Sequence, residues 1–512
     1  MLKDHPKGLL GAALSNMGER FGFYIMMAIL TLFLMSKFGI SKTEAGALYS
    51  IFYGGIYILA LVGGLIADRT KKYKGTIIAG LVVMSLGYLF LSMPALITSK
   101  GVALASLLII AFGNGLFKGN LQAIVGQMYD NPEYKAYIKE KYGEEADFKD
   151  AGFQIFYMFI NIGAMFSPLA AIWVRNWFVK IQGFAYNSDL PDLCWQYKNG
   201  TMSSEVLHGR FTELATQVSG GVTPEIASFA EKYLNAFNTG FHYAFSIAII
   251  AMIISLIIFF FSKKVLPDKK VIANTDKPQL SKAQIQQDAK EIQQRLLALF
   301  AVFAVVIFFW FSFHQNGLTL TMFAKEYTQL KVFGFDISAE IFQTINPILV
   351  VSLTPVIVWF FARLSKRGKE PSTPRKIGIG MAIAAFAFLL MALGSIGLPT
   401  AKEVEVMGGL AFDQRVTPWL LFATYFILTV AELFISPLGM SFVSKVAPAH
   451  LQGLMQGCWL GATAVGNFSL ILGAMMYESI SISLTWTVFV SVCLVSMFAM
   501  FVMVKWLERV AK

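Results

Sequence analysis

Long apolar segments recur along the whole chain of 512 residues, and they constrain its fold more than any other feature. A helix needs roughly 20 mostly apolar residues to cross the hydrocarbon core of a bilayer. Hydrophobic residues make up 56% of the chain and charged residues 14%, against about 25% charged residues in a typical soluble domain. This composition excludes a soluble enzyme, a disordered scaffold and a nucleic-acid-binding protein. It predicts an all-α polytopic membrane protein whose surroundings are a lipid bilayer.

Twelve segments have the length and composition of transmembrane helices. We predict these spans at 9–35, 45–67, 76–97, 102–127, 151–175, 239–262, 296–322, 341–362, 377–397, 417–437, 452–476 and 483–507. An even number of spans places both termini on the same side of the membrane.

Lys and Arg are unevenly distributed between these spans. They gather in the loops after the second, sixth and eighth spans, at 69–74, 263–290 and 363–376. By the positive-inside rule, these loops and both termini are predicted to be cytoplasmic. The net charge of +11 therefore reflects membrane topology and does not indicate a nucleic-acid partner. We expect a multi-pass protein of the plasma (inner) membrane.

Two polar segments divide the chain. Residues 176–238 are predicted to form an extracytoplasmic loop with a short helix at 224–235. Residues 263–295 are predicted to form a cytoplasmic linker with an amphipathic helix, in which Ser281 is the expected N-cap. The apolar residues that recur there at helical spacing are Ile285, Ala289, Ile292 and Leu296.

The linker separates two halves with six predicted spans each, an N-terminal bundle at 1–262 and a C-terminal bundle at 296–512. The strongest basic loops occupy the same place in each half, after the second span. This weak internal repeat is typical of two-lobed transporters.

Ionisable residues within the predicted spans are costly and usually mark a functional site. Five such residues are present, namely Glu19, Arg20, Lys118, His314 and Glu432. Without His314 their formal charges sum to zero, as a buried set requires. Glu19 and Arg20 are consecutive and point about 100° apart on a helix, so we expect each to pair elsewhere, Glu19 with Lys118. Static pairs that lock helices together are the alternative, which charges spread over both halves disfavour.

Polar and aromatic residues in the same spans are candidates for the lining of a cavity. Tyr49, Tyr53 and Tyr57 form one stripe on a helix, either as packing or, for Tyr57, as pocket lining. Asn161 and Asn346 are buried amides that bind a substrate backbone or satisfy kinked helices. Further candidates are Gln315 beside His314, and Trp459, which covers a pocket or packs at an interface.

The sequence has no constellation that an enzyme would need. We find no nucleophile with a base, no metal cluster and no carboxylate dyad. The cysteines at 194, 458 and 493 form no metal or disulfide pattern. We therefore expect a protein that is not an enzyme, binds no cofactor or metal, and functions as a monomer.

Several motifs resemble a known family. Gly63-Gly64-Leu65-Ile66-Ala67-Asp68-Arg69 resembles the loop signature of the major facilitator superfamily. Strings resembling those of the proton-dependent oligopeptide transporter (POT) family are Gly18-Glu19-Arg20-Phe21-Gly22-Phe23-Tyr24, Gly113-Asn114-Gly115-Leu116-Phe117-Lys118-Gly119-Asn120, Asp150-Ala151-Gly152-Phe153 with Phe156-Tyr157-Met158-Phe159-Ile160-Asn161-Ile162-Gly163, and Ala431-Glu432-Leu433 with Ser436-Pro437-Leu438-Gly439. Together they identify the chain as an atypical member of that family.

The resemblance implies a major facilitator fold and proton-coupled symport of di- and tripeptides. It implies that Glu432 binds the peptide amino terminus and that Lys118 faces the carboxylate. The pocket would be lined by Tyr24, Tyr57, Asn161, His314, Gln315, Asn346 and Trp459. Proton coupling would involve Glu19, Arg20, Lys118, His314 and Glu432.

The chain also departs from the family pattern. Asn16 replaces the first glutamate of the first motif, Met27 replaces the arginine of the first span, and His314 replaces the acid of the seventh. The family's arginine and acid are expected to pair, so the loss of both avoids a stranded charge. Gly119 replaces the usual proline after the lysine, and the 263–295 linker has no room for the two extra helices of many bacterial members. The alternative function is therefore transport of a non-peptide small solute, or transport with altered or absent proton coupling.

Overall fold

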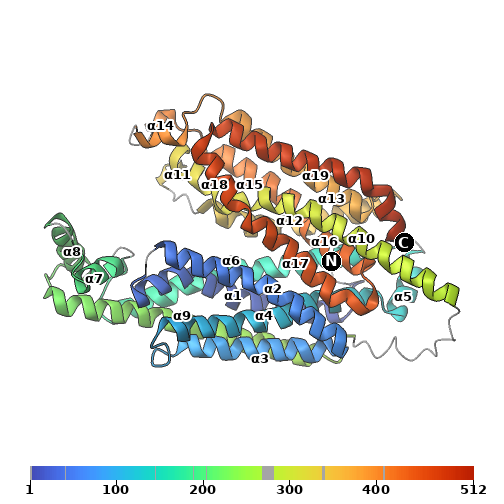
Figure 1. The fold of residues 1–512 in the computed structure, drawn as a ribbon, viewed down its shortest axis with the longest axis horizontal. Coiled ribbons are helices and arrows are strands. Elements are labelled where there is room, and N and C mark those ends of the chain that lie inside the picture. The colour runs from blue at the N-terminus through green and yellow to red at the C-terminus, as the bar shows by residue number, and fades with distance from the viewer. Residues whose placement is uncertain are drawn as a thin grey trace.

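The structure, a computed structural model, describes residues 3–40, 42–143, 146–187, 190–202, 205–267, 282–336, 341–406 and 410–511. Twelve of its helical segments are long and apolar enough to span a membrane, which confirms the predicted number. They form two bundles of six spans that lie side by side (Figure 1). We refer to these bundles as the N-lobe and the C-lobe.

The spans of the N-lobe are continuous helices. They are α1 (Gly8–Phe38), α2 (Lys42–Thr70), α3 (Tyr73–Ser92), α4 (Lys100–Tyr129), α6 (Lys149–Ile181) and α9 (Ile226–Ser262). Their continuity follows from long apolar sequences with little proline, since Pro168 is the only proline inside these helices.

Three spans of the C-lobe are broken. The continuous ones are α12 (Ile341–Ser365), α13 (Thr373–Gly394) and α19 (Ile482–Val510). The broken ones are α10 (Lys282–Phe313) with η2 (His314–Gly317) and α11 (Thr319–Tyr327); α15 (Pro418–Leu433) with α16 (Ser436–Val446); and η4 (Ala449–Leu451) with α17 (Gln452–Phe468) and α18 (Leu470–Ser479). Pro437 lies in the first turn of α16, where a missing N–H is tolerated, so the break falls one residue after Glu432, behind Leu433. Broken helices at mid-membrane often form the binding sites of transporters.

The two lobes meet at one end of the molecule and diverge at the other (Figure 1). We call the end that carries both termini the inner end; there α16 and α17 contact α2, α4 and α6. We call the opposite end, which carries α7 (Leu190–Lys198), α8 (Glu205–Val218) and α14 (Ala401–Val406), the outer end. The central space between the lobes is therefore closed toward the inner end.

Several elements were not predicted. They are α5 (Pro132–Tyr142), α7, α8, α14, η3 (Phe412–Gln414) and an antiparallel pair of strands, β1 (Lys331–Val332) and β2 (Phe335–Asp336). The first of these, α5, lies at the inner end between α4 and α6. It begins at Pro132 behind Asn131, whose side chain accepts from the N–H groups of Glu133 and Tyr134.

The predicted short helix at 224–235 is wrong as a separate element. The Glu225 carboxylate caps a helix that begins at Ile226 and continues without a break to Ser262, as α9. The helix therefore projects beyond the span predicted at 239–262. The predicted N-cap, Ser281, lies outside the described residues, and α10 runs from Lys282 directly into its span.

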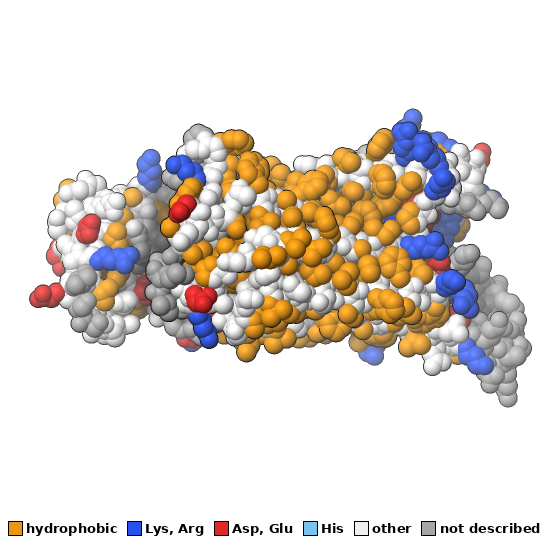
Figure 2. Space-filling view, turned by 90° about the horizontal axis from the view of Figure 1, so that it is seen from above, with side chains coloured by type: hydrophobic (Ala, Val, Ile, Leu, Met, Phe, Trp, Pro, Cys, Tyr) orange, Lys and Arg blue, Asp and Glu red, His pale blue; other side chains and the backbone are white. Residues whose placement is uncertain are grey.

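The surface confirms the membrane-spanning character of the bundle. An apolar band covers the middle of the molecule, and charged side chains gather at its two ends (Figure 2). Large apolar side chains are exposed, for example Trp173, Phe261 and Val495, at 69%, 78% and 68% of their surface. Such a continuous apolar exterior is stable only against lipid.

Candidate functional site

Glu19 and Arg20 of α1 form an ion pair with each other. The Nε and Nη2 atoms of Arg20 each lie 2.5 Å from a Glu19 carboxylate oxygen, and both side chains are almost fully buried. The Asn114 amide of α4 donates to the same carboxylate at 2.7 Å. The prediction that these neighbours pair elsewhere is wrong, because the 100° separation applies to their Cβ atoms. The long arginine side chain reaches back, and its guanidinium binds the carboxylate with two hydrogen bonds.

Lys118 of α4 is not the partner of Glu19, contrary to the prediction. In the part of the chain that the structure describes, no carboxylate lies within ion-pair distance of its ammonium group. The ammonium instead lies over the ring of Tyr57, 4.9 Å from the centroid. Lys118 is half-buried. It is therefore a cation that the protein leaves available in the interior of the N-lobe.

Glu432, at the end of α15, is held by two neutral donors. The Tyr157 hydroxyl of α6 lies 2.5 Å from one carboxylate oxygen, and the Asn346 amide of α12 lies 2.7 Å from the other. The carboxylate is 4% exposed, and no described cation lies within ion-pair distance of it. Because Tyr157 belongs to the N-lobe, this hydrogen bond joins the two lobes. Tyr157 belongs to the family-like motif that also contains Asn161, but the sequence did not single it out as a site residue.

The other candidates of the central region lie near these groups. Asn161 is one turn beyond Tyr157 on α6 and donates to its carbonyl at 3.1 Å. Tyr24 packs edge-on against Phe23, whose ring also receives the Arg20 guanidinium at 4.5 Å. Trp459 of α17 is 3% exposed and packs against Phe303 and Gly439.

His314 and Gln315 lie in η2, which packs mainly against α10, α11 and α18 of the same lobe. The His314 ring stacks on Trp310 with 4.8 Å between centroids. Gln315 is fully buried, donates to the Phe311 carbonyl at 3.2 Å and accepts from the Thr319 hydroxyl. The amide of Gln315 thus bonds within its own segment and packs against Gly473 of α18. The structure does not bring it together with Lys118 and Glu432.

A polar cluster on Asp150 of α6 closes the inner end. Its carboxylate accepts hydrogen bonds from two helices of the C-lobe. The donors are Thr373 at 3.0 Å and Lys376 at 2.8 Å from α13, and Ser441 at 2.6 Å and Lys445 at 2.8 Å from α16. Asp147 adds an ion pair to Lys445 at 2.8 Å. In the sequence, Lys376 belongs to the basic loop after the eighth predicted span, and Lys445 was not singled out.

A second contact between the lobes lies at Asp68, at the end of α2. Its carboxylate accepts from the backbone N–H groups of Gly453 and Leu454, at 3.2 and 2.8 Å, and so caps α17. Beside it, a Cβ on Gly64 would lie 2.4 Å from the Gly453 carbonyl oxygen. Only glycine permits this approach of α2 to α17, which keeps the inner end closed.

The N-terminal segment is attached to α5 next to this closure. Asp4 accepts from Lys141 at 2.5 Å and from Tyr142 at 2.7 Å, and these hydrogen bonds lower the pKa of Asp4 to about 2. The His5 ring lies 2.6 Å from the Tyr129 hydroxyl, and burial lowers the pKa of His5 to about 4. At neutral pH, therefore, Asp4 is charged and His5 is neutral.

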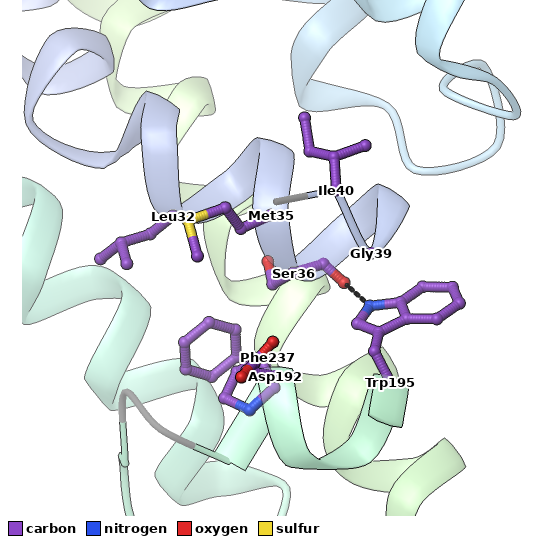
Figure 3. Close-up of a pocket in the computed structure, with 9 residues that line it drawn as sticks. Leu32, Met35, Ser36, Gly39, Ile40, Asp192, Trp195 and Phe237 are labelled. Atoms are coloured by element: carbon purple, nitrogen blue, oxygen red, sulfur yellow. Dashed lines mark hydrogen bonds between the residues drawn. The ribbon is translucent and has the colours of Figure 1, made fainter. Parts of the chain in front are cut away.

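A small cavity lies at the outer end of the N-lobe, between α1, α7 and α9 (Figure 3). It is lined by Leu32, Met35, Ser36, Gly39, Ile40, Pro191, Asp192, Trp195 and Phe237. The indole of Trp195 donates to the Ser36 carbonyl at 2.7 Å, a bond drawn in Figure 3. None of the buried charges of the spans lines this cavity. The contacts between its lining residues attach α7 to the end of α1.

Two six-span lobes around buried charges and broken helices define a secondary transporter of the major facilitator fold. The sequence profile described as the POT family matches residues 74–280 and 268–488. The chain belongs to the POT family.

Among curated proteins, the chain is similar to the peptide transporter YePEPT of Yersinia enterocolitica, with 28% identity over 480 residues that cover 91% of this chain and 86% of the relative. It is also similar to the dipeptide and tripeptide permease B of Salmonella typhimurium, with 26% identity and coverage of 90% and 84%.

Solved structures share the fold. A peptide transporter POT in complex with sulfate matches with a TM-score of 0.57 and 22% identity, over 100% of this chain and 96% of the other. A POT family transporter in complex with 5-aminolevulinic acid matches with a TM-score of 0.59 and 20% identity, over 100% and 98%.

Proposed function

We propose that this protein is a symporter that carries di- and tripeptides together with protons by alternating access. Its family membership and its similarity to proteins named as peptide transporters support this function. The observation that carries the proposal is the pair of unneutralised charges, Lys118 in the N-lobe and Glu432 in the C-lobe. A zwitterion with separated termini would neutralise both charges.

A peptide also has amide groups that need hydrogen-bond partners when buried. Asn161, Asn346 and the hydroxyls of Tyr24 and Tyr57 would supply them, and Trp459 would cover side chains. A free amino acid has no internal amide group for these partners. This favours short peptides as the substrate.

Transport requires that the inner end opens. The lobes would rock about the central site, and the contacts of Asp150 and Asp68 across the lobes would break. The closed inner end and the separated outer end correspond to a state that receives substrate from outside. The domain division at 262 and 296 would separate the two moving bodies, joined by the 263–295 linker.

For proton coupling, we propose Glu432 as the principal site. A buried carboxylate without a cation is costly, and either a proton or the amino group of a peptide would neutralise it. Because both would occupy the same carboxylate, a proton that is carried together with the peptide must be bound at a second group. Lys118 and the Glu19–Arg20 pair are the further proposed members of the coupling machinery, whereas His314 has two candidate roles, titration or structure, which His314→Gln distinguishes.

A second candidate function is transport without proton coupling, or of a non-peptide solute. It is favoured by the state of Glu19, which Arg20 and Asn114 already satisfy, and by the replacements at Asn16 and Met27. Glu432 opposes a purely anionic substrate.

The proposed orientation places both termini and the linker in the cytoplasm and α7 and α8 outside the cell membrane. Figure 2 shows a gathering of Lys and Arg side chains at the end that Figure 1 marks with the termini, which supports this orientation. We propose a monomer as the functional unit, with transport rather than catalysis as its activity.

Uptake of labelled dialanine into proteoliposomes, with and without an inward proton gradient, tests the proposal. We expect uptake above that of protein-free liposomes, increased by the gradient and abolished by a protonophore. Counterflow against unlabelled dialanine separates the alternatives. Counterflow without a gradient response would indicate an uncoupled peptide carrier, and absence of counterflow would exclude peptide transport.

A further inference from the structure

The ammonium group of Lys118 relies on an aromatic ring instead of a carboxylate. It lies 4.9 Å from the centroid of the Tyr57 ring, a distance typical of a cation–π interaction. Such an interaction depends on the ring face, since the ring edge carries the opposite partial charge. The orientation of the Tyr57 ring therefore determines where the cation is held.

Tyr53, one turn earlier on α2, fixes this orientation. The Tyr57 hydroxyl donates to the Tyr53 hydroxyl at 3.1 Å. The two rings are also in edge contact, with 5.3 Å between centroids and an interplanar angle of 81°. The terminal torsion of a tyrosine is otherwise broad, so these two contacts select one ring position.

Tyr49 supports this pair only by packing. Its ring is stacked on Tyr53, with 6.2 Å between centroids and an angle of 15°. Within the described ranges its hydroxyl makes no hydrogen bond. Tyr49 and Tyr53 thus offer a matched comparison on one helix face, since only the Tyr53 hydroxyl is hydrogen-bonded.

We propose that Tyr53 is a positioning residue for substrate recognition, which acts through Tyr57 on Lys118. It holds the ring on which the ammonium rests and so presents the cation to the carboxylate of the substrate. This inference rests on the proposed function, because it assumes that Lys118 meets a substrate carboxylate. It predicts an effect on carboxylate recognition and not on transport as a whole.

The test compares Tyr53→Phe with Tyr49→Phe. Each removes one hydroxyl and keeps the ring. Binding of dialanine and of dialanine amide, which lacks the carboxylate, is measured by titration calorimetry on the purified protein, and uptake of dialanine gives KM and maximal rate. For Tyr53→Phe we expect the Kd and KM for dialanine to rise about three- to tenfold, the effect of one hydrogen bond. The maximal rate and the Kd for the amide should remain within about twofold of wild type, well below the effect of one hydrogen bond.

Tyr49→Phe should match the wild type in all of these measurements. The variant Tyr57→Phe removes the donor of the same bond, so adding Tyr53→Phe to it should cause no further loss. Equal effects of the variants at 49 and 53, or equal loss for dialanine and its amide, would overturn the positioning role. If wild-type protein binds neither dialanine nor its amide, the proposed function fails. If wild type prefers the free peptide and Tyr53→Phe keeps that preference, the positioning inference alone fails.

Discussion

Lys376 of α13 donates a hydrogen bond to Asp150 of α6, with 2.8 Å between Nζ and the carboxylate oxygen. Both side chains are buried, at 1% and 7% exposure, and they belong to different lobes. This contact therefore belongs to the conformation that is closed at the inner end, and any opening of that end must break it.

The first prediction concerns this closure. Lys376→Met should favour opening, because removal of one partner leaves a buried charge less compensated, although Lys445 still binds Asp150. With a reporter cysteine, Ser444→Cys, near Gly126 at the interface of the lobes, we expect maleimide labelling at least about tenfold faster.

Arg375→Gln is the control for this variant. Arg375 neighbours Lys376 but pairs with Glu508 of its own lobe, at 2.7 Å, and is exposed to solvent. When Arg375→Gln is combined with Ser444→Cys, the labelling rate should match that of Ser444→Cys alone. An unchanged rate in Lys376→Met would show that Lys376 does not hold the inner end closed.

The second prediction concerns Glu432. Glu432→Gln should weaken binding of dialanine about ten- to hundredfold, the range for loss of a bond to a charged group. Tyr157 and Asn346 donate to different oxygens of this carboxylate, and a glutamine would place an NH2 group, which cannot accept, opposite one of these donors. N-acetyl-dialanine should bind the wild type poorly and be little affected by the substitution. Titration calorimetry measures both peptides, with Glu478→Gln at the outer end of the C-lobe as the control. Equal wild-type affinity for free and acetylated peptide would contradict the assignment.

The third prediction concerns Lys118. Lys118→Ala should abolish gradient-driven uptake of dialanine. Arg20 cannot replace the lost cation, because it is already paired with Glu19. The melting temperature should change little, since the ammonium forms no ion pair in the described structure. Lys100→Gln, which removes an exposed surface pair with Glu44, should transport normally. Near-normal driven uptake by Lys118→Ala would exclude the proposed role.

The fourth prediction concerns His314, for which the sequence leaves two roles open, titration during transport or a structural hydrogen bond. Its stacking on Trp310 and the contacts of η2 within the C-lobe favour the structural role. We therefore expect His314→Gln to retain both uptake and its pH dependence between pH 5 and pH 8. Loss of the pH dependence with retained substrate binding would instead assign the titration to His314.

The fifth prediction concerns the N-terminal segment. Hydrogen bonds from Lys141 and Tyr142 lower the pKa of Asp4 to about 2, from an ordinary value of 3.8. The contribution of Asp4 to stability is therefore present above about pH 4 and is lost only as the pH falls toward the lowered value. Asp4→Asn should therefore lower the melting temperature by about the same amount at every pH between 5 and 8. Glu133→Gln on the same α5 should leave the melting temperature unchanged.

The sequence by itself determined the number of spans and their place in the chain. Length and hydropathy are local properties, since each stretch of apolar residues must bury its own backbone hydrogen bonds in lipid. The sequence also identified the buried charges, because an ionisable residue inside an apolar segment is evident without knowledge of its surroundings. The family resemblance came from local motifs of the same kind.

Only the tertiary structure decided which of these groups meet. Pairing depends on helix faces that are distant in the chain, so Tyr157 and Glu432, 275 residues apart, gave no joint signal. It also depends on side-chain reach, which allowed Arg20 to bind its neighbour Glu19 and left Lys118 over Tyr57. The closure of the inner end at Asp150 arose in the same way, because charges that look like loop residues in the sequence become buried partners when two lobes pack together.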